Sequence, residues 1–216
     1  GAPTVLPAAL LARVFRTERA RALFLGTMAH AMRPLTEVVS SAIGMGILTA
    51  GHHDGWPVVV GGTQRLTEAM AAAIGDLGGK IETGVPVTSL SQLPRADAVL
   101  LNLSPTAALG LYADRLPAGT RRAYRRQRYG PAVFKVDFAV EGDVPWTNPA
   151  ARRAGTVHLG GDFAEIATTE RDIHAGRMPQ RPFVLAFQQY LADPGRSVGT
   201  VNPVSAYAHV PNGYSG

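Results

Sequence analysis

Cysteine is absent from the 216 residues, which excludes disulfides and thiolate chemistry. A chain without cysteine carries no sign of an oxidising compartment, so we expect a cytoplasmic protein. No stretch approaches the ~20 consecutive apolar residues of a membrane-spanning helix. The N-terminus also lacks the basic flank, apolar run and cleavage site of a secretory signal.

Lysine is scarce, because Lys80 and Lys135 are the only two, so the net charge of +5 is almost entirely arginine. Arginine forks bind phosphate and carboxylate, which raises an anionic ligand or nucleic acid as a partner. The densest basic stretch, residues 121–128, has little aromatic interleaving apart from Tyr124. A helix with a solvated basic face explains it, and we expect no nucleic-acid partner.

Familiar catalytic motifs are missing as well. A dinucleotide fingerprint needs three glycines in a strand-to-helix turn, whereas Gly44-Met45-Gly46 and Gly61-Gly62 supply two each. Nucleophile elbow, zinc helix and phosphate loop are all absent from the sequence. His52, His53 and Asp54 are adjacent on an expected loop, where their side chains diverge, so we expect no metal. Sequence motifs therefore identify no catalytic residue in this chain.

Apolar periodicity in the first third favours helices. Leu10, Leu11, Val14 and Phe15 recur at helical steps, and Thr17 with Glu18 resembles a helix start. We predict a further helix opening near Pro34, loosened by the glycines at 44 and 46, and a loop over 49–57.

The middle of the chain alternates between helical and extended patterns. Thr63 is expected to cap a helix that Gly78-Gly79 ends, and Ser104-Pro105 opens another. The run Ala98–Leu101 reads as a buried strand. Extended segments are expected at 58–60, 80–82, 85–87 and 98–101.

From Pro131 the apolar period changes to two, which is typical of strands. A helix boxed by Asp162 and Glu165 interrupts this region. The sequence predicts an α+β fold: a helical N-terminal part, α/β alternation in the middle, and a mixed or antiparallel sheet. Strands are expected at 133–140, 156–159, 182–190 and 204–210. We divide the chain at 1–57, 58–130 and 131–216.

Both ends of the sequence suggest an internal piece of a longer protein. Gly1 stands where a methionine would, and the chain stops at Gly213–Gly216 just after a strand-like run.

A series of phrases in order along the chain resembles the phytoene-dehydrogenase-like group of the FAD-dependent amine oxidase and carotenoid desaturase superfamily. One phrase runs from Gly61 to Ile81 and consists of two glycines, a predicted helix, two further glycines and a predicted strand. The phrases are AHAMRPL (29–35), GWP through LGGKI (55–81), ADAVLL with Ser104-Pro105, FKVDFA with VPW (134–146), GTVHLGG (155–161), RPFV (181–184) and YAHVPNG (207–213).

This resemblance implies a two-part flavoenzyme, in which a Rossmann-like domain holds FAD and a substrate domain covers the flavin ring. Residues 1–57 would be a helical substrate or cap region, 58–130 a segment re-entering the FAD domain, and 131–216 the substrate sheet. The family's N-terminal glycine fingerprint and its C-terminal FAD segment are not in the chain, so we expect the piece alone not to retain FAD. The segment between Val87 and Ala98 is shorter than in typical carotenoid desaturases, which speaks against a carotenoid substrate.

The resemblance also implies site residues. The cofactor-binding positions would be Val87, Asn102, Ser104 and Pro105. For the polar groups along an apolar substrate tunnel we select His30, Tyr207 and His209. The alternative for each of these three residues is a hydrogen-bonded structural role in the core. The same two roles are open for His158, which we do not select.

The expected activity is hydride transfer from an apolar small molecule to flavin in the parent protein, an FAD-dependent oxidoreductase. Two alternatives stay open: a non-catalytic ligand-binding or self-association module, and a redox-neutral flavin isomerase. Peripheral membrane contact and homo-oligomers formed through exposed apolar surface stay open as partners.

Overall fold

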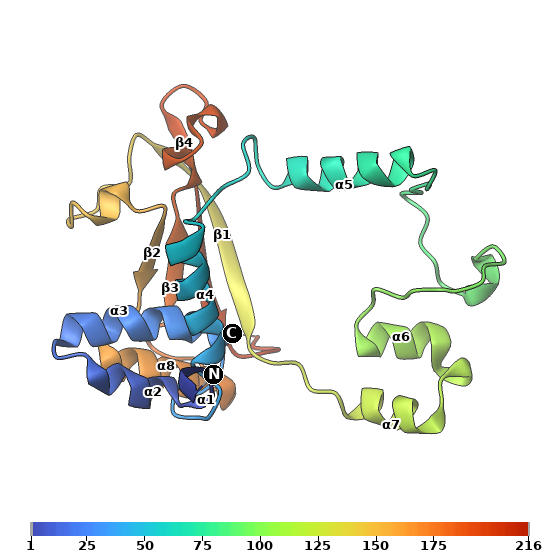
Figure 1. Cartoon of the computed structure of the whole chain (residues 1–216), viewed down its shortest axis with the longest axis horizontal. Coiled ribbons are helices and arrows are strands. Elements are labelled where there is room, and N and C mark those ends of the chain that lie inside the picture. Colours follow the sequence, from blue (N-terminus) through green and yellow to red (C-terminus); the bar gives the residue numbers. More distant parts are fainter. Residues whose placement is uncertain (1, 216) are drawn as a thin grey trace. The chain divides into compact units, whose positions relative to one another are not determined.

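A four-stranded antiparallel sheet with helices packed against it forms the core of the computed structural model, which describes residues 2–215 (Figure 1). The strand order is β1-β4-β3-β2, and this confirms the α+β class. The strands are β1 (Ala132–Glu141), β2 (Thr156–Leu159), β3 (Val184–Phe187) and β4 (Val201–Val210).

Helices precede, interrupt and connect these strands. The α-helices are α1 (Ala2–Val5), α2 (Ala8–Leu11), α3 (Glu18–Met28), α4 (Ala42–His53), α5 (Gln64–Asp76), α6 (Pro105–Tyr112), α7 (Ala118–Arg126) and α8 (Phe163–His174). Short 3₁₀ turns, η1 to η7, lie at Ala12–Val14, Ala29–Ala31, Leu90–Gln92, Ala113–Arg115, Ala151–Arg153, Gln189–Leu191 and Pro194–Arg196.

The predicted helix starts at Thr17 and Asp162 are confirmed. The Thr17 hydroxyl accepts a hydrogen bond from the Ala20 amide, and Asp162 with Glu165 forms a reciprocal capping box. These caps satisfy amides that the first helical turn leaves without partners. Glu18 then accepts a bond from the Phe163 amide, which ties the start of α3 to that of α8.

The pairing register sorts the strand residues onto two faces of the sheet. Lys135, Tyr207, Leu185 and His158 lie in one row across it, so they share a face. We call this the inner face, because its Leu185 is completely buried. The outer face carries Phe134, Val136 and Phe138 of β1 beside Ala208, Ala206 and Val204 of β4.

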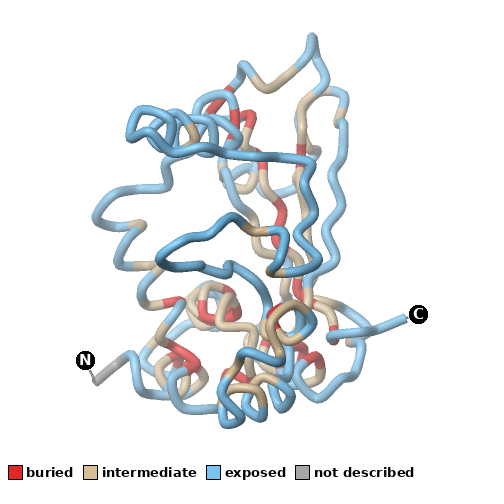
Figure 2. Tube along the Cα trace, turned by 90° about the vertical axis from the view of Figure 1, so that its right-hand side faces the viewer, coloured by how far each residue is buried: buried red, intermediate tan, exposed pale blue. Residues whose placement is uncertain are grey.

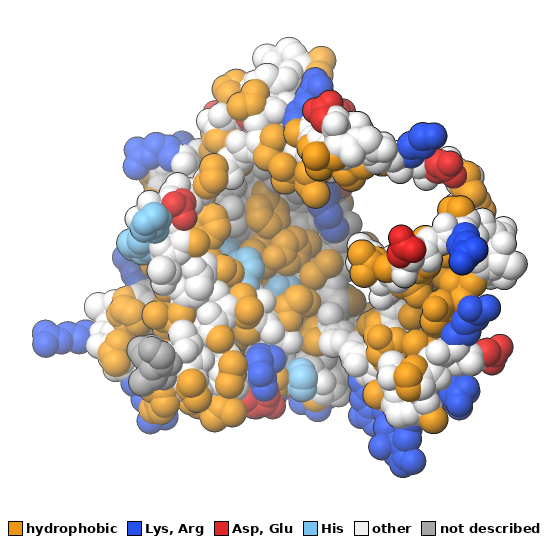
Figure 3. All heavy atoms as spheres, turned by 45° about the vertical axis from the view of Figure 1, so that its right-hand side comes forward, with side chains coloured by type: hydrophobic (Ala, Val, Ile, Leu, Met, Phe, Trp, Pro, Cys, Tyr) orange, Lys and Arg blue, Asp and Glu red, His pale blue; other side chains and the backbone are white. Residues whose placement is uncertain are grey.

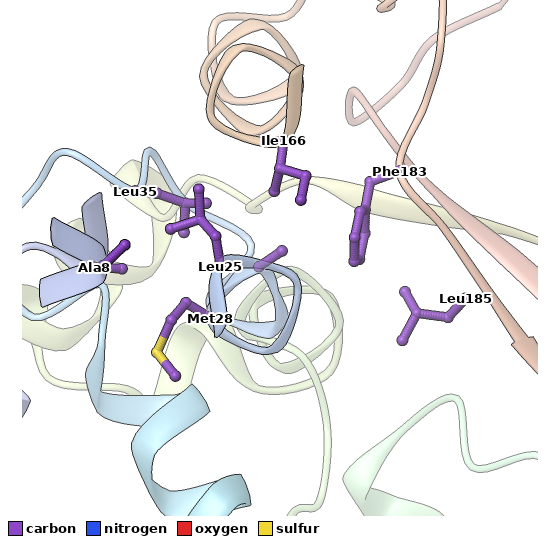
Figure 4. Packing of buried hydrophobic residues seen from close by; sticks show 9 residues of the cluster. Ala8, Leu25, Met28, Leu35, Ile166, Phe183 and Leu185 are labelled. Atoms are coloured by element: carbon purple, nitrogen blue, oxygen red, sulfur yellow. The ribbon is translucent and has the colours of Figure 1, made fainter. Parts of the chain in front are cut away.

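The hydrophobic core joins the inner face to α3 and α8. In Figure 4, Leu25 of α3, Ile166 of α8 and Phe183 beside β3 lie close to one another. Each is at most 2% exposed. Burying side chains of this size stabilises the fold by about 1.5–3 kcal/mol apiece, before the entropy of ordering is subtracted.

The helix predicted to open near Pro34 is wrong in its boundaries. Residues 35–41 form turns and a bend, and α4 begins only at Ala42 and continues through both glycines into the first part of the expected loop, ending at His53. Buried Ser40 explains the delay. Its hydroxyl donates to the Leu35 and Glu37 carbonyls and accepts from the Ala8 amide, so it competes with helical pairing.

The described chain divides into two compact units. Unit 1 contains the chain up to Ala69 and from Gly130 on; unit 2 is Met70–Tyr129. Figure 2 shows the buried positions (red) gathered along the sheet and helices of unit 1. Among the residues of unit 2, all of them described, only Ala108 is buried.

The extended segments predicted for the middle of the chain do not pair into strands within the described residues. Residues 58–60, 80–82, 85–87 and 98–101 are irregular, and the run predicted as a buried strand is exposed, with Leu100 96% accessible. The turn at Gly61-Gly62 and the helix end at Gly78 are confirmed by their positive φ angles. Because the predicted extended segments have no pairing partners among the described residues, most of their apolar side chains remain exposed to solvent.

Candidate functional site

Three histidines, a tyrosine, a phenylalanine and a glutamate meet between the inner face and helices α3 and α8. We call this group the histidine cluster; it consists of His30, His158, Glu170, Phe183, Tyr207 and His209. Sheet alternation places His158, Tyr207 and His209 on one face, while Glu170 comes from α8.

His158 lies against α3 because Gly26 has no side chain. A Cβ atom at position 26 would stand 3.2 Å from His158 Nδ1, closer than ordinary contacts. His30, four residues further along, brings its Nε2 to 3.3 Å from His158 Nε2. One of the two rings donates this hydrogen bond and the other accepts it, so at least one ring is neutral.

His209 and Glu170 form the most buried polar contact of the cluster. Nδ1 of His209 lies 2.6 Å from Oε1 of Glu170, and each residue is 1% exposed. The second carboxylate oxygen, Oε2, has no hydrogen-bond partner among the described residues. A buried carboxylate with one free oxygen is costly unless something else satisfies it.

Aromatic contacts link the two polar pairs. The Phe183 ring stands 5.4 Å from the rings of both His158 and His209, and Tyr207 stacks on His209 at 5.9 Å. Burial raises the pKa of the Tyr207 phenol, and the charge of Glu170 adds to this effect. Tyr207 therefore keeps its proton and can donate a hydrogen bond.

The His30 and His158 imidazoles stay neutral at pH 7. Burial lowers the pKa of His158 from 6.5 to about 4, with help from the charges of His30 and His209. Burial, followed by the charge of His209, also lowers the pKa of His30. Neutral imidazoles can both donate and accept, so the cluster suits orientation of a hydroxyl or carbonyl group at the end of an apolar surface.

The three residues selected from the sequence for a substrate tunnel thus come together in space. His30 and Tyr207 are half-buried, whereas His209 is almost fully buried. The sequence did not select Glu170, although a signal was available: it lies on the same helical face as Ile166 and Ile173, where an acidic residue is out of place. The sequence favours a hydrogen-bonded core role over a substrate-facing one for His158, and it does not predict the contact with His30.

The residues predicted to bind FAD lie in unit 2, and three of the four are exposed. Val87 is 41% exposed in an irregular segment, and Asn102 is also exposed. Ser104 caps α6 by accepting from the Ala107 amide, and Pro105 is the first residue of that helix. Helix capping accounts for the Ser104-Pro105 pair without a ligand.

Other candidate positions lie outside the cluster. Two open depressions of about 490 and 590 Å³ flank α4 and are lined by residues of that helix, including Thr49 and His53, and by Thr4. His53 bonds the exposed Asp54 side chain. Within residues 2–215, no group of three or more His, Asp or Glu side chains has the geometry to hold a metal ion.

Histidine side chains (pale blue) appear among hydrophobic ones (orange) in Figure 3. None of the described helices combines the length and apolar character needed to cross a bilayer. No protein-family model, curated protein or solved structure matches this chain.

Proposed function

We propose that this chain is the substrate-domain part of an FAD-dependent oxidoreductase of the phytoene-dehydrogenase-like type, which transfers a hydride from an apolar substrate to flavin. The observation that carries the proposal is the histidine cluster. The polar side chains selected from two distant stretches of sequence, His30 in one and Tyr207 with His209 in the other, meet among apolar side chains at one sheet face. The proposal retains the cytoplasmic location that the lack of cysteine favours.

In this proposal the cluster orients the polar end of the substrate. His30 and Tyr207, which are half-buried, would face that group, while Glu170 holds the His209 ring from behind through the 2.6 Å contact. A ring fixed by a buried carboxylate loses little entropy on binding a ligand. The apolar surroundings would exclude water from the reacting carbon.

The residues of this chain do not by themselves fit FAD. A dinucleotide cradle needs a parallel sheet and a glycine turn opening a helix, whereas the described sheet is antiparallel and Val87, Asn102 and Ser104 are exposed. The flavin would therefore be held mainly by polypeptide outside this chain. We accordingly expect the purified chain to be colourless, and we derive no step through the cofactor.

The test uses both the chain and a longer protein that contains it. The longer protein should purify yellow, with one flavin per polypeptide, and lose its visible flavin absorbance when an apolar alcohol or alkene donor is added without oxygen. His209→Phe should slow this bleaching about 100-fold or more, in line with the loss of a positioned polar group. Val198→Ala, a matched change on exposed surface of unit 1, should leave the rate unchanged.

Three results would contradict the proposal. A stoichiometric yellow complex of this chain alone would show that the fit to FAD has been misjudged. A longer protein that never binds flavin would remove the function altogether. Turnover with the flavin unchanged and no acceptor consumed would favour the redox-neutral isomerase.

One observation favours a second function, a non-catalytic association module. Many large apolar side chains are exposed to solvent, including Leu77 and Leu100 of unit 2, which are 89% and 96% exposed. Exposed apolar patches mark interaction surfaces. Under this alternative the chain alone would bind a partner, and the His209→Phe variant would bind it equally well.

A further inference from the structure

Strand β1 forms a free edge of the sheet. Within residues 2–215 it pairs with β4 on one side and with no strand on the other, and all residues from 133 to 139 are exposed. Figure 1 shows β1 as the long outer strand. Phe134 and Phe138 on the outer face are 66% and 49% exposed. An edge strand of this length, with apolar side chains and free backbone groups, is a template for pairing with another strand.

The sequence of β1 is complementary to itself when it is reversed. If a twofold axis passes beside Val136, antiparallel pairing sets Lys135 opposite Asp137 of the second copy. The same register sets Phe134 opposite Phe138 and Val136 opposite Val136. The Lys135–Asp137 pairs then lie on one face, and the Phe134–Phe138 and Val136–Val136 pairs lie on the other, because side chains alternate along a strand.

The charged pair is already in position within one copy. Lys135 Nζ lies 2.5 Å from Asp137 Oδ1, and the Ser205 hydroxyl donates to the same oxygen at 2.5 Å. Both carboxylate and ammonium are more than half exposed. In the paired arrangement each Asp137 carboxylate would lie between its own Lys135 and that of the second copy.

We propose that two copies of this chain associate edge to edge through β1, antiparallel and centred on Val136, to form one continuous eight-stranded sheet. The occupant of the free edge is thus a second copy, and charge complementarity is the reason for choosing it. This inference is independent of the proposed oxidoreductase activity, because it uses no residue of the histidine cluster.

Charge-swap variants test the register. Lys135→Asp sets Asp against Asp at both crossing points, and Asp137→Lys sets Lys against Lys, so each variant alone should dimerise about tenfold more weakly. An equimolar mixture of the two should form heterodimers, because each crossing then pairs Asp with Lys. The double variant K135D/D137K should regain the wild-type dissociation constant in sedimentation equilibrium.

Cysteine cross-linking gives a second measurement that does not depend on charge. The chain has no cysteine of its own, so single substitutions report cleanly. Val136→Cys places two thiols across the axis, within the Cα separation that a disulfide allows. It should form covalent dimers at least about tenfold faster than Ala139→Cys, which faces Val133 of the second copy.

Circular dichroism must show that each variant is folded. Wild-type protein that stays monomeric at all concentrations would overturn the proposal. So would a mixture of single variants that behaves as the average of its parts, or equal cross-linking at positions 136 and 139.

Discussion

Units 1 and 2 contain similar apolar sequence patterns, but among the described residues nearly all of the buried apolar side chains lie in unit 1. In unit 1 the two-residue period of β3 and β4 is paired and buried, and Leu185 is fully covered. In unit 2 the run Ala98–Leu101 is equally apolar, yet it has no pairing strand among the described residues and is exposed. A strand-like pattern therefore becomes a strand only when another strand is available to pair with it.

The same contrast holds for helices. The apolar face of α3 packs on α4 and α8 around Leu25 and Met28, whereas α5, most of which lies in unit 2, exposes Met70 and Ile74. A lone helix of about 13 residues is marginal in water.

The largest expected difference is in amide hydrogen exchange. Amides of β3 and β4 should exchange more than about a hundredfold more slowly than those of residues 80–104, because opening the core costs much of the global stability and unit 2 has little to open. Mass spectrometry of peptic fragments would measure this. Strong protection at 98–101 would mean that these residues find a partner in solution.

Removal of the buried carboxylate should cost the most stability. Glu170→Ala leaves His209 buried without its partner and should lower the free energy of unfolding by about 3–5 kcal/mol. Glu82→Ala removes the same charge from the exposed surface of unit 2 and should change it by less than about 0.5 kcal/mol. Urea titrations of both variants provide the measurement; equal effects would refute the buried pair.

Glycine-to-alanine changes in helices should differ in sign between packed and open positions. A Cβ at Gly44 would stand 2.7 Å from the Met28 Cα atom, so α3 and α4 must separate, at a cost of about 1–3 kcal/mol. Gly75 in α5 and Gly46 in α4 have open space instead. Alanine there should raise helix stability by up to about 1 kcal/mol. Thermal melts followed at a helical wavelength would distinguish the three variants.

The smallest effect concerns pH and unit 1 alone. Because the pKa of His158 is lowered to about 4 in the fold, the unfolded chain binds a proton below pH 6.5 that the folded chain does not. The free energy of unfolding therefore falls as the pH drops from 6.5 toward 4, on the order of 0.5 kcal/mol between pH 7 and pH 6. The lowered pKa of His30 acts in the same direction.

His158→Asn should flatten this dependence, as measured by urea midpoints at pH 7, 6 and 5. An imidazole that titrates near 6.5 in the folded protein by NMR would contradict the burial of His158.

Much of the fold follows from local chemistry in the sequence. The caps at Thr17 and Asp162, the stop at Gly78 and the period-two run of β1 are decided within a few residues, so they could be predicted. The start of α4 could not, because Ser40 turns the chain by bonding the Ala8 amide 32 residues away. The three-segment division of the chain stays a prediction.

For the candidate site, the sequence singled out His30, Tyr207 and His209, and composition alone determined that no thiol takes part. Only the tertiary structure decided that these residues meet, that His158 and Glu170 complete the group, and that the apolar residues of unit 2 find no cover. The physical reason is the separation along the sequence over which each kind of interaction acts. Caps and periodicities act between near neighbours, whereas burial and pairing depend on which distant segments are present to pack against.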